Sequence, residues 1–167
     1  MAELETLISA ERIRARIAEL GPQIRAHFGD EPIVCVGVLK GSFLFMADLV
    51  RTIDGPVTCE FLGVSSYKGT QSTGTVRISN DLTANIEGKN VLLVEDIVDT
   101  GLTLDYLLRT LLQRNPEMLA VATLLDKPSK RTVPVPVDWV GFEIPDAFVV
   151  GYGLDLDQEY RNLAYIA

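Results

Sequence analysis

The stretch Val91-Leu92-Leu93-Val94-Glu95-Asp96-Ile97-Val98-Asp99-Thr100-Gly101-Leu102-Thr103 decides the fold, because an apolar strand leads directly into acids and a short polar turn. The consecutive apolar residues from Val91 to Val94 predict a parallel strand that is buried on both faces. In such sheets, ligands collect beyond the carboxyl ends of the strands. Glu95 and Asp96 are expected at that end, so the chemistry of this protein should lie there.

The turn Asp99-Thr100-Gly101 opens a predicted helix that should end at Asn115-Pro116. Its apolar face is predicted from leucines at helical spacing, namely Leu104, Leu107, Leu108, Leu111 and Leu112. A turn with a glycine, unpaired backbone N–H groups and two threonine hydroxyls suits a phosphomonoester. The neighbouring carboxylates would repel a bare phosphate, but they fit a ligand that also carries a diol or a divalent cation. A sugar phosphate meets both demands.

A plainer alternative is that Glu95 and Asp96 are solvated residues and that Asp99 or Thr103 only caps the helix. The combination of acids, glycine and threonines in one short stretch favours a binding site instead. The stretch resembles the phosphoribosyl pyrophosphate (PRPP) motif of the type I phosphoribosyltransferases, and its complete residue sequence resembles that of their hypoxanthine-guanine branch. The resemblance implies ribose and metal contacts at Glu95 and Asp96, and a site for the 5-phosphate formed by Asp99, Thr100, Gly101, Leu102 and Thr103.

Length and composition predict one well-filled domain over residues 1–167, since 47% of the residues are hydrophobic. No apolar run approaches the roughly 20 residues of a membrane span, and the N-terminus lacks the basic start of a signal peptide. We therefore expect a cytoplasmic protein with no membrane partner. Cys35 and Cys59 show no C-x-x-C pairing and are expected to be reduced thiols in the core.

The net charge of −8 argues against a nucleic-acid partner, which would need a basic face. An anionic substrate must then be held by local positive groups and by metal. One such group is Lys40, because a predicted strand from Ile33 to Val38 leads into Leu39-Lys40-Gly41-Ser42 before a predicted helix from Phe43 to Val50. A cation, an approachable backbone and a hydroxyl suit pyrophosphate. The resemblance places the pyrophosphate loop at Leu39, Lys40 and Gly41, with a cis peptide bond before Lys40.

Two further strands, from Val57 to Val64 and from Thr75 to Ser79, are joined by a polar connection that contains almost nothing to bury. Such a connection is either a tolerated surface loop or a lid. The resemblance identifies Ser66 and Tyr67 as the lid signature. A closing lid would exclude water from a reactive sugar cation.

The remaining candidate residues lie in the C-terminal part of the chain. A buried strand is predicted from Met118 to Leu125, and extended segments after Trp139 predict an irregular flap over the site. The resemblance implies that Lys127 contacts the exocyclic oxygen of a purine and acts in catalysis with Asp99. It further implies that the purine stacks on Phe148 and meets the Val149 backbone, that Asp155 lies beside the purine and holds Mg²⁺ together with Glu95 and Asp96, and that Arg161 reaches pyrophosphate.

Together these features predict an α/β fold with a central, mostly parallel sheet, flanking helices, a small hood and a flexible lid hairpin. The resemblance implies purine salvage: Mg²⁺-dependent transfer of the 5-phosphoribosyl group from PRPP to a 6-oxopurine, hypoxanthine or guanine, giving IMP or GMP and pyrophosphate. Asp99 is the candidate general acid/base, because it alone of the motif acids is placed at the lip of the turn towards the base. The resemblance also implies a homodimer or homotetramer.

Three alternatives remain open. One is transfer to another base, such as xanthine or a pyrimidine, although Lys127 and the segment at Phe148 favour a 6-oxopurine. The second is a PRPP-sensing regulator that binds RNA, which would need a basic face. The third is a signalling receiver domain, whose acidic pocket lies near the N-terminus of the domain, whereas here the acids lie past the middle of the chain.

Overall fold

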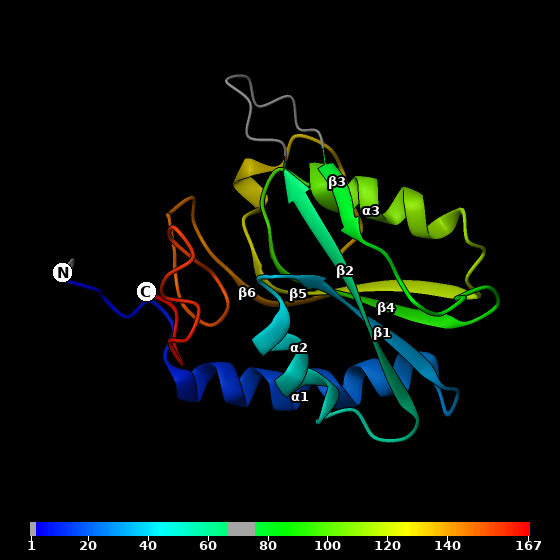
Figure 1. Cartoon of the computed structure of the whole chain (residues 1–167). Coiled ribbons are helices and arrows are strands. Elements are labelled where there is room, and N and C mark those ends of the chain that lie inside the picture. Colours follow the sequence, from blue (N-terminus) through cyan, green and yellow to red (C-terminus); the bar gives the residue numbers. More distant parts are fainter. Residues whose placement is uncertain (1–2, 67–75) are drawn as a thin grey trace.

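A central sheet organises the molecule, and its strand order is β3-β2-β1-β4-β5-β6 (Figure 1). The coordinates are a computed structural model that describes residues 3–66 and 76–167. Within these residues, β3 runs antiparallel to β2, whereas every other pair of neighbouring strands is parallel. The bounds are β1 Ile33–Leu39, β2 Val57–Ser66, β3 Val76–Asn80, β4 Asn90–Val98, β5 Met118–Asp126 and β6 Trp139–Glu143. The predicted α/β class with a mostly parallel sheet is confirmed.

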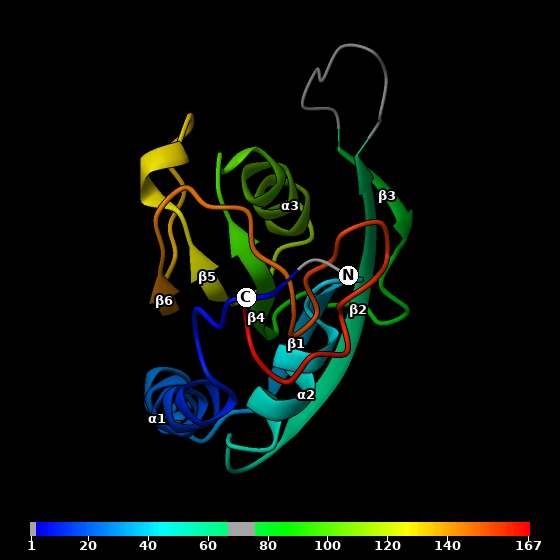
Figure 2. The same ribbon diagram turned by 90° about the vertical axis from the view of Figure 1, so that its left-hand side faces the viewer.

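Helices cover both faces of the sheet, as the view in Figure 2 shows. Helices α1 (Ala10–Phe28) and α2 (Phe43–Val50) pack on one face, and α3 (Leu102–Leu112) packs on the other. Successive strand residues point to opposite faces, so Leu92 and Val94 join the core beneath α1 and α2, while Val91 and Leu93 join the core beneath α3. The sheet is therefore buried on both faces, as its apolar strands predict.

The structure confirms the predicted bounds of α2 but ends α3 earlier than predicted. The bounds predicted for α2 are confirmed, and Ser9 caps α1 by accepting a hydrogen bond from the Arg12 backbone N–H at 3.2 Å. Helix α3 ends at Leu112 rather than at Asn115-Pro116, and Leu112 is exposed. Asn115 has a φ of 53°, a left-handed conformation that no helix continues through, so the chain has already turned before the proline.

Two predictions about strands were wrong. Strand β4 continues to Val98, so Glu95 and Asp96 lie within the strand and not beyond its end, because its pairing with β5 extends to Asp126. The predicted flap begins as β6, which pairs in parallel with β5 at the edge of the sheet. From Ile144 onward the chain is irregular and ends in a bridge between Ile8 and Ile166, which brings the two termini of the fold together.

The cysteines lie opposite each other on β1 and β2, but only one of them is a core thiol. Burial raises the pKa of Cys35 to about 12, so this thiol stays protonated. Cys59 is exposed, contrary to the prediction. Within the described residues, the longest helix is too polar to cross a membrane.

Candidate active site

One cavity of about 370 Å³ opens at the carboxyl ends of β1 and β4. Three groups of predicted site residues line it: Leu39, Lys40 and Gly41 from the turn after β1, Glu95 and Asp96 from β4, and Asp99, Gly101 and Thr103 from the turn before α3. Asp155 and Arg161 close it from the C-terminal segment. Residues that are far apart in the sequence thus form a single concave site.

The turn before α3 is held open by hydrogen bonds of its own. The Asp99 carboxylate accepts from the Thr100 backbone N–H at 2.5 Å, and the Thr100 hydroxyl accepts from the Leu102 N–H at 3.3 Å. The N-cap of α3 is Gly101, so neither Asp99 nor Thr103 occupies the capping position of this helix. The alternative that Asp99 or Thr103 only caps the helix is therefore wrong. Thr100 and the half-exposed Leu102 belong to the turn but do not line the cavity.

Gly101 is required at this turn for two separate reasons. Its φ is +89°, a conformation that L side chains rarely adopt, and a Cβ would lie only 2.9 Å from the Val133 carbonyl oxygen and 3.1 Å from Arg131 Cδ. Gly88 has a similar φ of +70°, but open space surrounds the position of its missing Cβ. Alanine substitutions at the two glycines can therefore separate the cost of backbone strain from the cost of steric overlap.

We expect Gly101→Ala to lower the free energy of unfolding by more than the roughly 1–3 kcal/mol of backbone strain, and to weaken binding of ribose 5-phosphate. Gly88→Ala should show the strain alone, with normal ribose 5-phosphate binding. Urea unfolding and calorimetric titration measure the two effects. Equal destabilisation by both variants, with equal ligand affinity, would contradict the steric role of Gly101.

Glu95 and Asp96 form an adjacent acid pair whose charge the fold suppresses. Burial, reinforced by the neighbouring Asp96, raises the pKa of Glu95 well above its usual value near 4.5. Burial also raises the pKa of Asp96, although the Ile97 backbone N–H donates to Asp96 Oδ1 at 2.7 Å and Arg161 opposes the rise. The pair therefore holds a proton more tightly than two solvated acids would, and it titrates as a unit.

This raised pKa predicts a pH dependence of stability in metal-free protein. Because folded Glu95 retains its proton at pH values where the unfolded chain has lost it, the free energy of unfolding should fall as pH rises above about 4.5, until folded Glu95 also ionises. Glu95→Gln should lack this part of the decline, whereas the exposed Glu117→Gln should retain it. Urea titrations between pH 5 and 9 with a chelator would test this. Parallel curves for wild type and Glu95→Gln would rule out the shift.

The turn after β1 packs tightly against the acid pair. The peptide bond between Leu39 and Lys40 is cis, as the family resemblance implied. A Cβ on Gly41 would overlap with Asp96 Oδ2, and a Cβ on Gly153 would overlap with the Gly41 carbonyl oxygen. The backbone at Gly41 therefore lies against both the Asp96 side chain and the backbone at Gly153, which only glycine permits at positions 41 and 153.

Lys40 and Arg161 converge on a residue that the sequence did not single out. Gln158 Oε1 accepts from Lys40 Nζ and from Arg161 Nη2, both at 3.2 Å. Gln158 has a φ of 70°, and its backbone N–H donates to Asp155 Oδ2 at 2.9 Å. Arg161 also donates to the Gly153 carbonyl at 2.6 Å and lies 3.5 Å from Asp155 Oδ1. Two cations thus share one neutral oxygen acceptor at the cavity wall, an arrangement suited to an anion with several oxygens.

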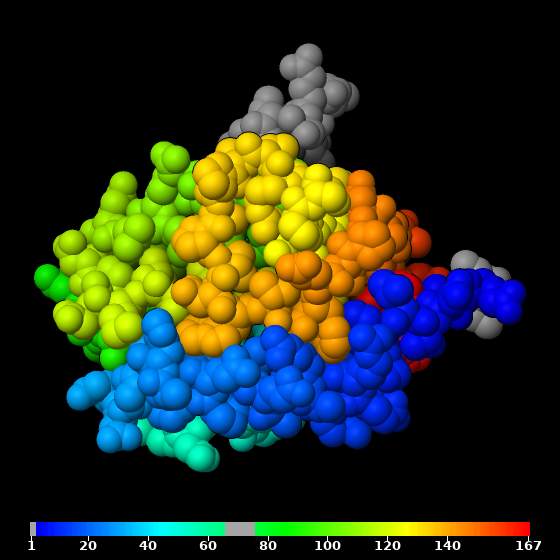
Figure 3. All heavy atoms as spheres, turned by 180° about the vertical axis from the view of Figure 1, so that it is seen from behind, coloured from blue at the N-terminus to red at the C-terminus, as the bar shows by residue number. Residues whose placement is uncertain are grey.

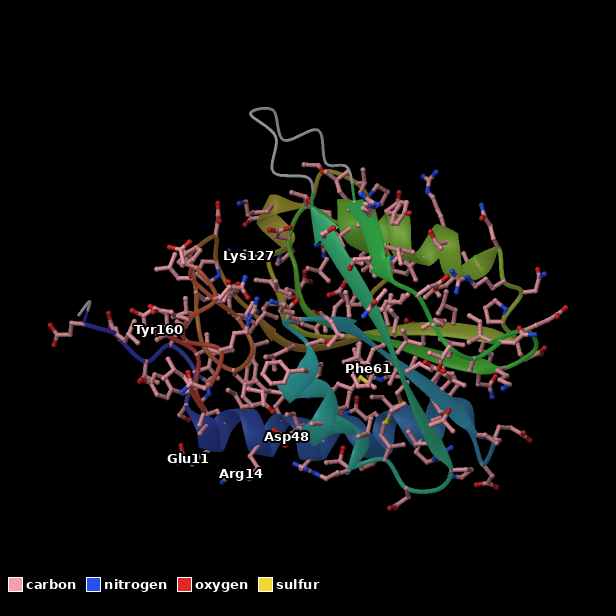
Figure 4. All side chains as sticks on the ribbon, viewed as in Figure 1. Glu11, Arg14, Asp48, Phe61, Lys127 and Tyr160 are labelled. Carbon is pink, nitrogen blue, oxygen red and sulfur yellow. The ribbon has the colours of Figure 1, made fainter. Side chains whose placement is uncertain are left out.

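Of the predicted purine residues, Asp155 lines this first cavity, whereas Lys127, Phe148 and Val149 do not. Lys127 is almost fully buried at the end of β5, where its backbone N–H donates to the Val98 carbonyl at 2.9 Å (Figure 4). Its Nζ lies 3.8 Å from Asp146 Oδ1, and Lys130 Nζ lies 3.6 Å from the same atom. Phe148 is 71% exposed and, with Val149, lines a second cavity of about 420 Å³ beside the N-terminal residues. Its exposure excludes a role in the core.

The lid is only partly described. Ser66 is the last residue of β2 and pairs with Val76 of β3, whereas Tyr67 lies outside the described residues. Val64 and Val76, at the base of this hairpin, line the first cavity. The base of the hairpin therefore forms part of the wall of the first cavity.

The carboxylates suit a hard divalent cation only if the substrate supplies further oxygens. Among residues 3–66 and 76–167, no three His, Cys, Asp or Glu side chains gather closely enough to hold a metal ion by themselves. Mg²⁺ is commonly bound by one or two carboxylates together with substrate phosphate oxygens. Glu95, Asp96 and Asp155 line one cavity with the cations that suit a pyrophosphate, which fits that mode.

Comparison with known proteins identifies what the chain is similar to. The model of the phosphoribosyl transferase domain family matches residues 4–157. The hypoxanthine phosphoribosyltransferase of Haemophilus influenzae is 54% identical, with 98% of this chain and 93% of the relative covered. The hypoxanthine-guanine phosphoribosyltransferase of Bacillus subtilis is 47% identical over 97% of this chain and 91% of its own length.

Solved structures agree with the sequence relatives. A crystal structure of a hypoxanthine-guanine phosphoribosyltransferase from Bacillus anthracis, with a HEPES molecule in its active site, superposes with a TM-score of 0.95 at 48% identity. The match covers 99% of this chain and 98% of that one. A hypoxanthine phosphoribosyltransferase from Trypanosoma cruzi matches with a TM-score of 0.92 at 44% identity, over 100% of this chain and 93% of its own.

Proposed function

The chain belongs to the phosphoribosyltransferase family, and on that premise we propose that it salvages purines by transferring the 5-phosphoribosyl group of PRPP to hypoxanthine or guanine. The products are IMP or GMP and pyrophosphate. Relatives named for both bases support this substrate pair. The whole of residues 1–167 acts as one catalytic domain in the cytoplasm.

A single observation supports this proposal: one cavity is lined by residues that we assign to each part of PRPP. The turn Asp99 to Thr103 presents backbone N–H groups to the 5-phosphate. Glu95 and Asp96 line the same cavity and accept hydrogen bonds from the ribose hydroxyls. Lys40, Arg161 and the Leu39-Lys40-Gly41 backbone hold the pyrophosphate.

The chemistry follows from the charges of these residues. The bond from the anomeric carbon to pyrophosphate breaks ahead of attack by the purine nitrogen, and Lys40 and Arg161 balance the charge that appears on the leaving group. The acid pair lies beside the sugar, where it stabilises the positive charge that develops on the ribose. Asp99 accepts the proton released from the imidazole ring of the purine. No nucleophilic side chain is required.

Glu95, Asp96 and Asp155 would hold Mg²⁺ together with oxygens of the substrate, and the bound ion would supply positive charge to the leaving group. The residues assigned to the purine complete the active site. Lys127 donates to the 6-oxygen of the purine, Phe148 stacks on the ring, Val149 meets the base edge through its backbone and Asp155 lies beside it. Ser66 and Tyr67 belong to the lid that covers the reacting sugar.

The direct test is an assay with PRPP, Mg²⁺ and hypoxanthine or guanine, in which the nucleotide product and pyrophosphate are separated by chromatography. We expect IMP or GMP and pyrophosphate in equal amounts, with loss of activity in a chelator. Formation of ribose 5-phosphate and pyrophosphate without nucleotide would show a hydrolase and contradict the proposal.

The enzyme assembles as a homodimer or homotetramer. Large apolar side chains are exposed on the fold, among them Phe43 at the start of α2. Phe61 on β2, labelled in Figure 4, is another. The published work on the Trypanosoma cruzi relative concerns how the C-terminal region affects oligomeric state and activity of that protein. Sedimentation at micromolar concentration should show a dimer or tetramer. A species of 18.3 kDa alone would contradict this.

A further inference from the structure

Arg131 lies behind the turn that receives the 5-phosphate and takes no part in the chemistry described above. It follows the short turn η1 (Pro128–Lys130), which lies next to the start of α3 in both Figure 1 and Figure 2. In Figure 3 this part of the chain, in yellow, forms the upper edge of the face seen from behind. The side chain of Arg131 is nevertheless only 21% exposed, because it points inward.

The two ends of the Arg131 guanidinium connect the turn to β5. Nη1 donates to the Asp99 carbonyl oxygen at 2.9 Å, and Nη2 donates to Asp126 Oδ1 at 2.7 Å. The Asp126 side chain is 8% exposed, so this charged hydrogen bond is largely shielded from water. Asp126 directly precedes Lys127 in the chain. One side chain therefore joins the backbone of Asp99 to the strand end that carries Lys127.

The residues after Arg131 hold the next peptide of the turn. The Thr100 carbonyl oxygen accepts from the backbone N–H groups of Thr132 and Val133, at 2.9 and 3.3 Å. The C=O and N–H of a trans peptide point in opposite directions. Since the Thr100 carbonyl is directed toward residues 132 and 133, the Gly101 N–H is directed the other way, and Gly101 lines the cavity. Arg131 and the two residues after it thus hold the turn from the side opposite the cavity. The backbone N–H groups of the turn therefore face the site of the phosphate.

From these contacts we propose that Arg131 is a positioning residue, which orients the 5-phosphate turn and fixes Asp99 relative to Lys127. This inference rests on the proposed function for the identity of the bound phosphate. Lysine could keep the ion pair with Asp126, but it lacks the planar fork that reaches two acceptors at once. Removal of the clamp should therefore affect ligands of the turn, and should leave ligands of Lys40 and Arg161 unaffected.

The experiment compares two ligands that occupy opposite ends of the cavity. Ribose 5-phosphate reports on the turn, and Mg²⁺-pyrophosphate reports on Lys40 and Arg161, both by calorimetry. Arg131→Met should weaken ribose 5-phosphate binding by about 10- to 100-fold, as loss of residues that support direct ligands commonly does. Pyrophosphate affinity should stay within about twofold of wild type, since no clamped peptide contacts it. The value of kcat/KM for PRPP should fall by about 100-fold, the cost of small misplacement at a reacting centre.

Arg131→Lys provides a milder change that keeps the positive charge, and it should recover only part of the ribose 5-phosphate affinity. Arg114→Met is the matched control, because Arg114 makes a two-pronged ion pair with Asp81 at 2.8 and 2.9 Å outside the cavity. This control should bind both ligands normally.

Equal weakening of both ligands by Arg131→Met would indicate general damage and overturn the positioning role. So would wild-type affinity for ribose 5-phosphate in Arg131→Met, or full recovery in Arg131→Lys. Failure of the proposed function is distinguishable, because it would appear as a wild-type protein that binds ribose 5-phosphate but forms no nucleotide.

Discussion

Replacement of Asp99 with asparagine is expected to lower kcat by about 10²- to 10⁴-fold, the usual contribution of a general acid or base, while PRPP binding survives. Asparagine has nearly the same shape, and its side-chain oxygen can still accept from the Thr100 N–H, as Asp99 Oδ1 does at 2.5 Å. The Asp99 backbone also remains clamped by Arg131 at 2.9 Å. The turn should therefore keep its geometry, and the loss should fall on proton transfer from the purine.

The matched control is Asp105→Asn. Asp105 lies in the first turn of α3 and pairs with Arg109 at 3.0 Å, but it does not line the cavity. This variant should show wild-type kcat. Single-turnover rates with hypoxanthine, together with calorimetric PRPP affinities, separate chemistry from binding. If Asp99→Asn retains wild-type kcat, or loses PRPP binding as strongly as it loses rate, Asp99 is not the general base.

The second large effect is rejection of adenine. Lys127 Nζ is a donor without acceptor capacity, so in the proposed site it would pair with the 6-oxygen of hypoxanthine or guanine and oppose the 6-amino group of adenine. In a closed site, a polar group left unpaired discriminates by about 10⁴- to 10⁵-fold. We therefore expect kcat/KM for adenine to lie below that for hypoxanthine by about this factor. Xanthine, which shares the 6-oxygen, should be poor through its 2-position, near Val149 and Asp155.

Lys127→Ala should bring adenine and hypoxanthine closer together, mainly by lowering the rate with hypoxanthine. Lys130→Ala is the control. The Lys130 ammonium lies 3.6 Å from Asp146 Oδ1, the same atom that lies near the Lys127 ammonium, but the Lys130 side chain is 40% exposed. The preference should be unchanged in this control. Adenine within about tenfold of hypoxanthine in the wild type, or an intact preference in Lys127→Ala, would remove Lys127 from base selection.

Local sequence patterns predicted the centre of the fold well. Strands such as β1 and β5 are continuous apolar runs, and α2 lies between a polar turn and a break, so short-range chemistry is sufficient to define them. The edge strand β6 was mistaken for a flap, because its surroundings are rich in proline and its pairing partner, β5, supplies the missing order. Leu112 was wrongly assigned to the apolar face of α3, because helical periodicity alone does not reveal where that face stops contacting the core.

The site was predictable where its residues adjoin strand ends. Residues 95–103 and 39–41 carry their chemistry in nearby positions, and the structure brings all of them except Thr100 and Leu102 into one cavity. Arg131 and Gln158 were missed because their roles depend on partners that folding brings close: the Asp99 carbonyl for one, and Lys40 with Arg161 for the other. An arginine after a strand end was the only signal in the sequence for Arg131.

The most direct test of the central claim is a crystal structure of the enzyme with PRPP, Mg²⁺ and a purine analogue that cannot be transferred. We expect the 5-phosphate at the backbone N–H groups of residues 101–103, the ribose hydroxyls beside Glu95 and Asp96, and the pyrophosphate between Lys40 and Arg161. We also expect Gln158 to release these two cations to the pyrophosphate. A reversed PRPP, with the 5-phosphate at Lys40 and the pyrophosphate at Gly101, would contradict the proposed function.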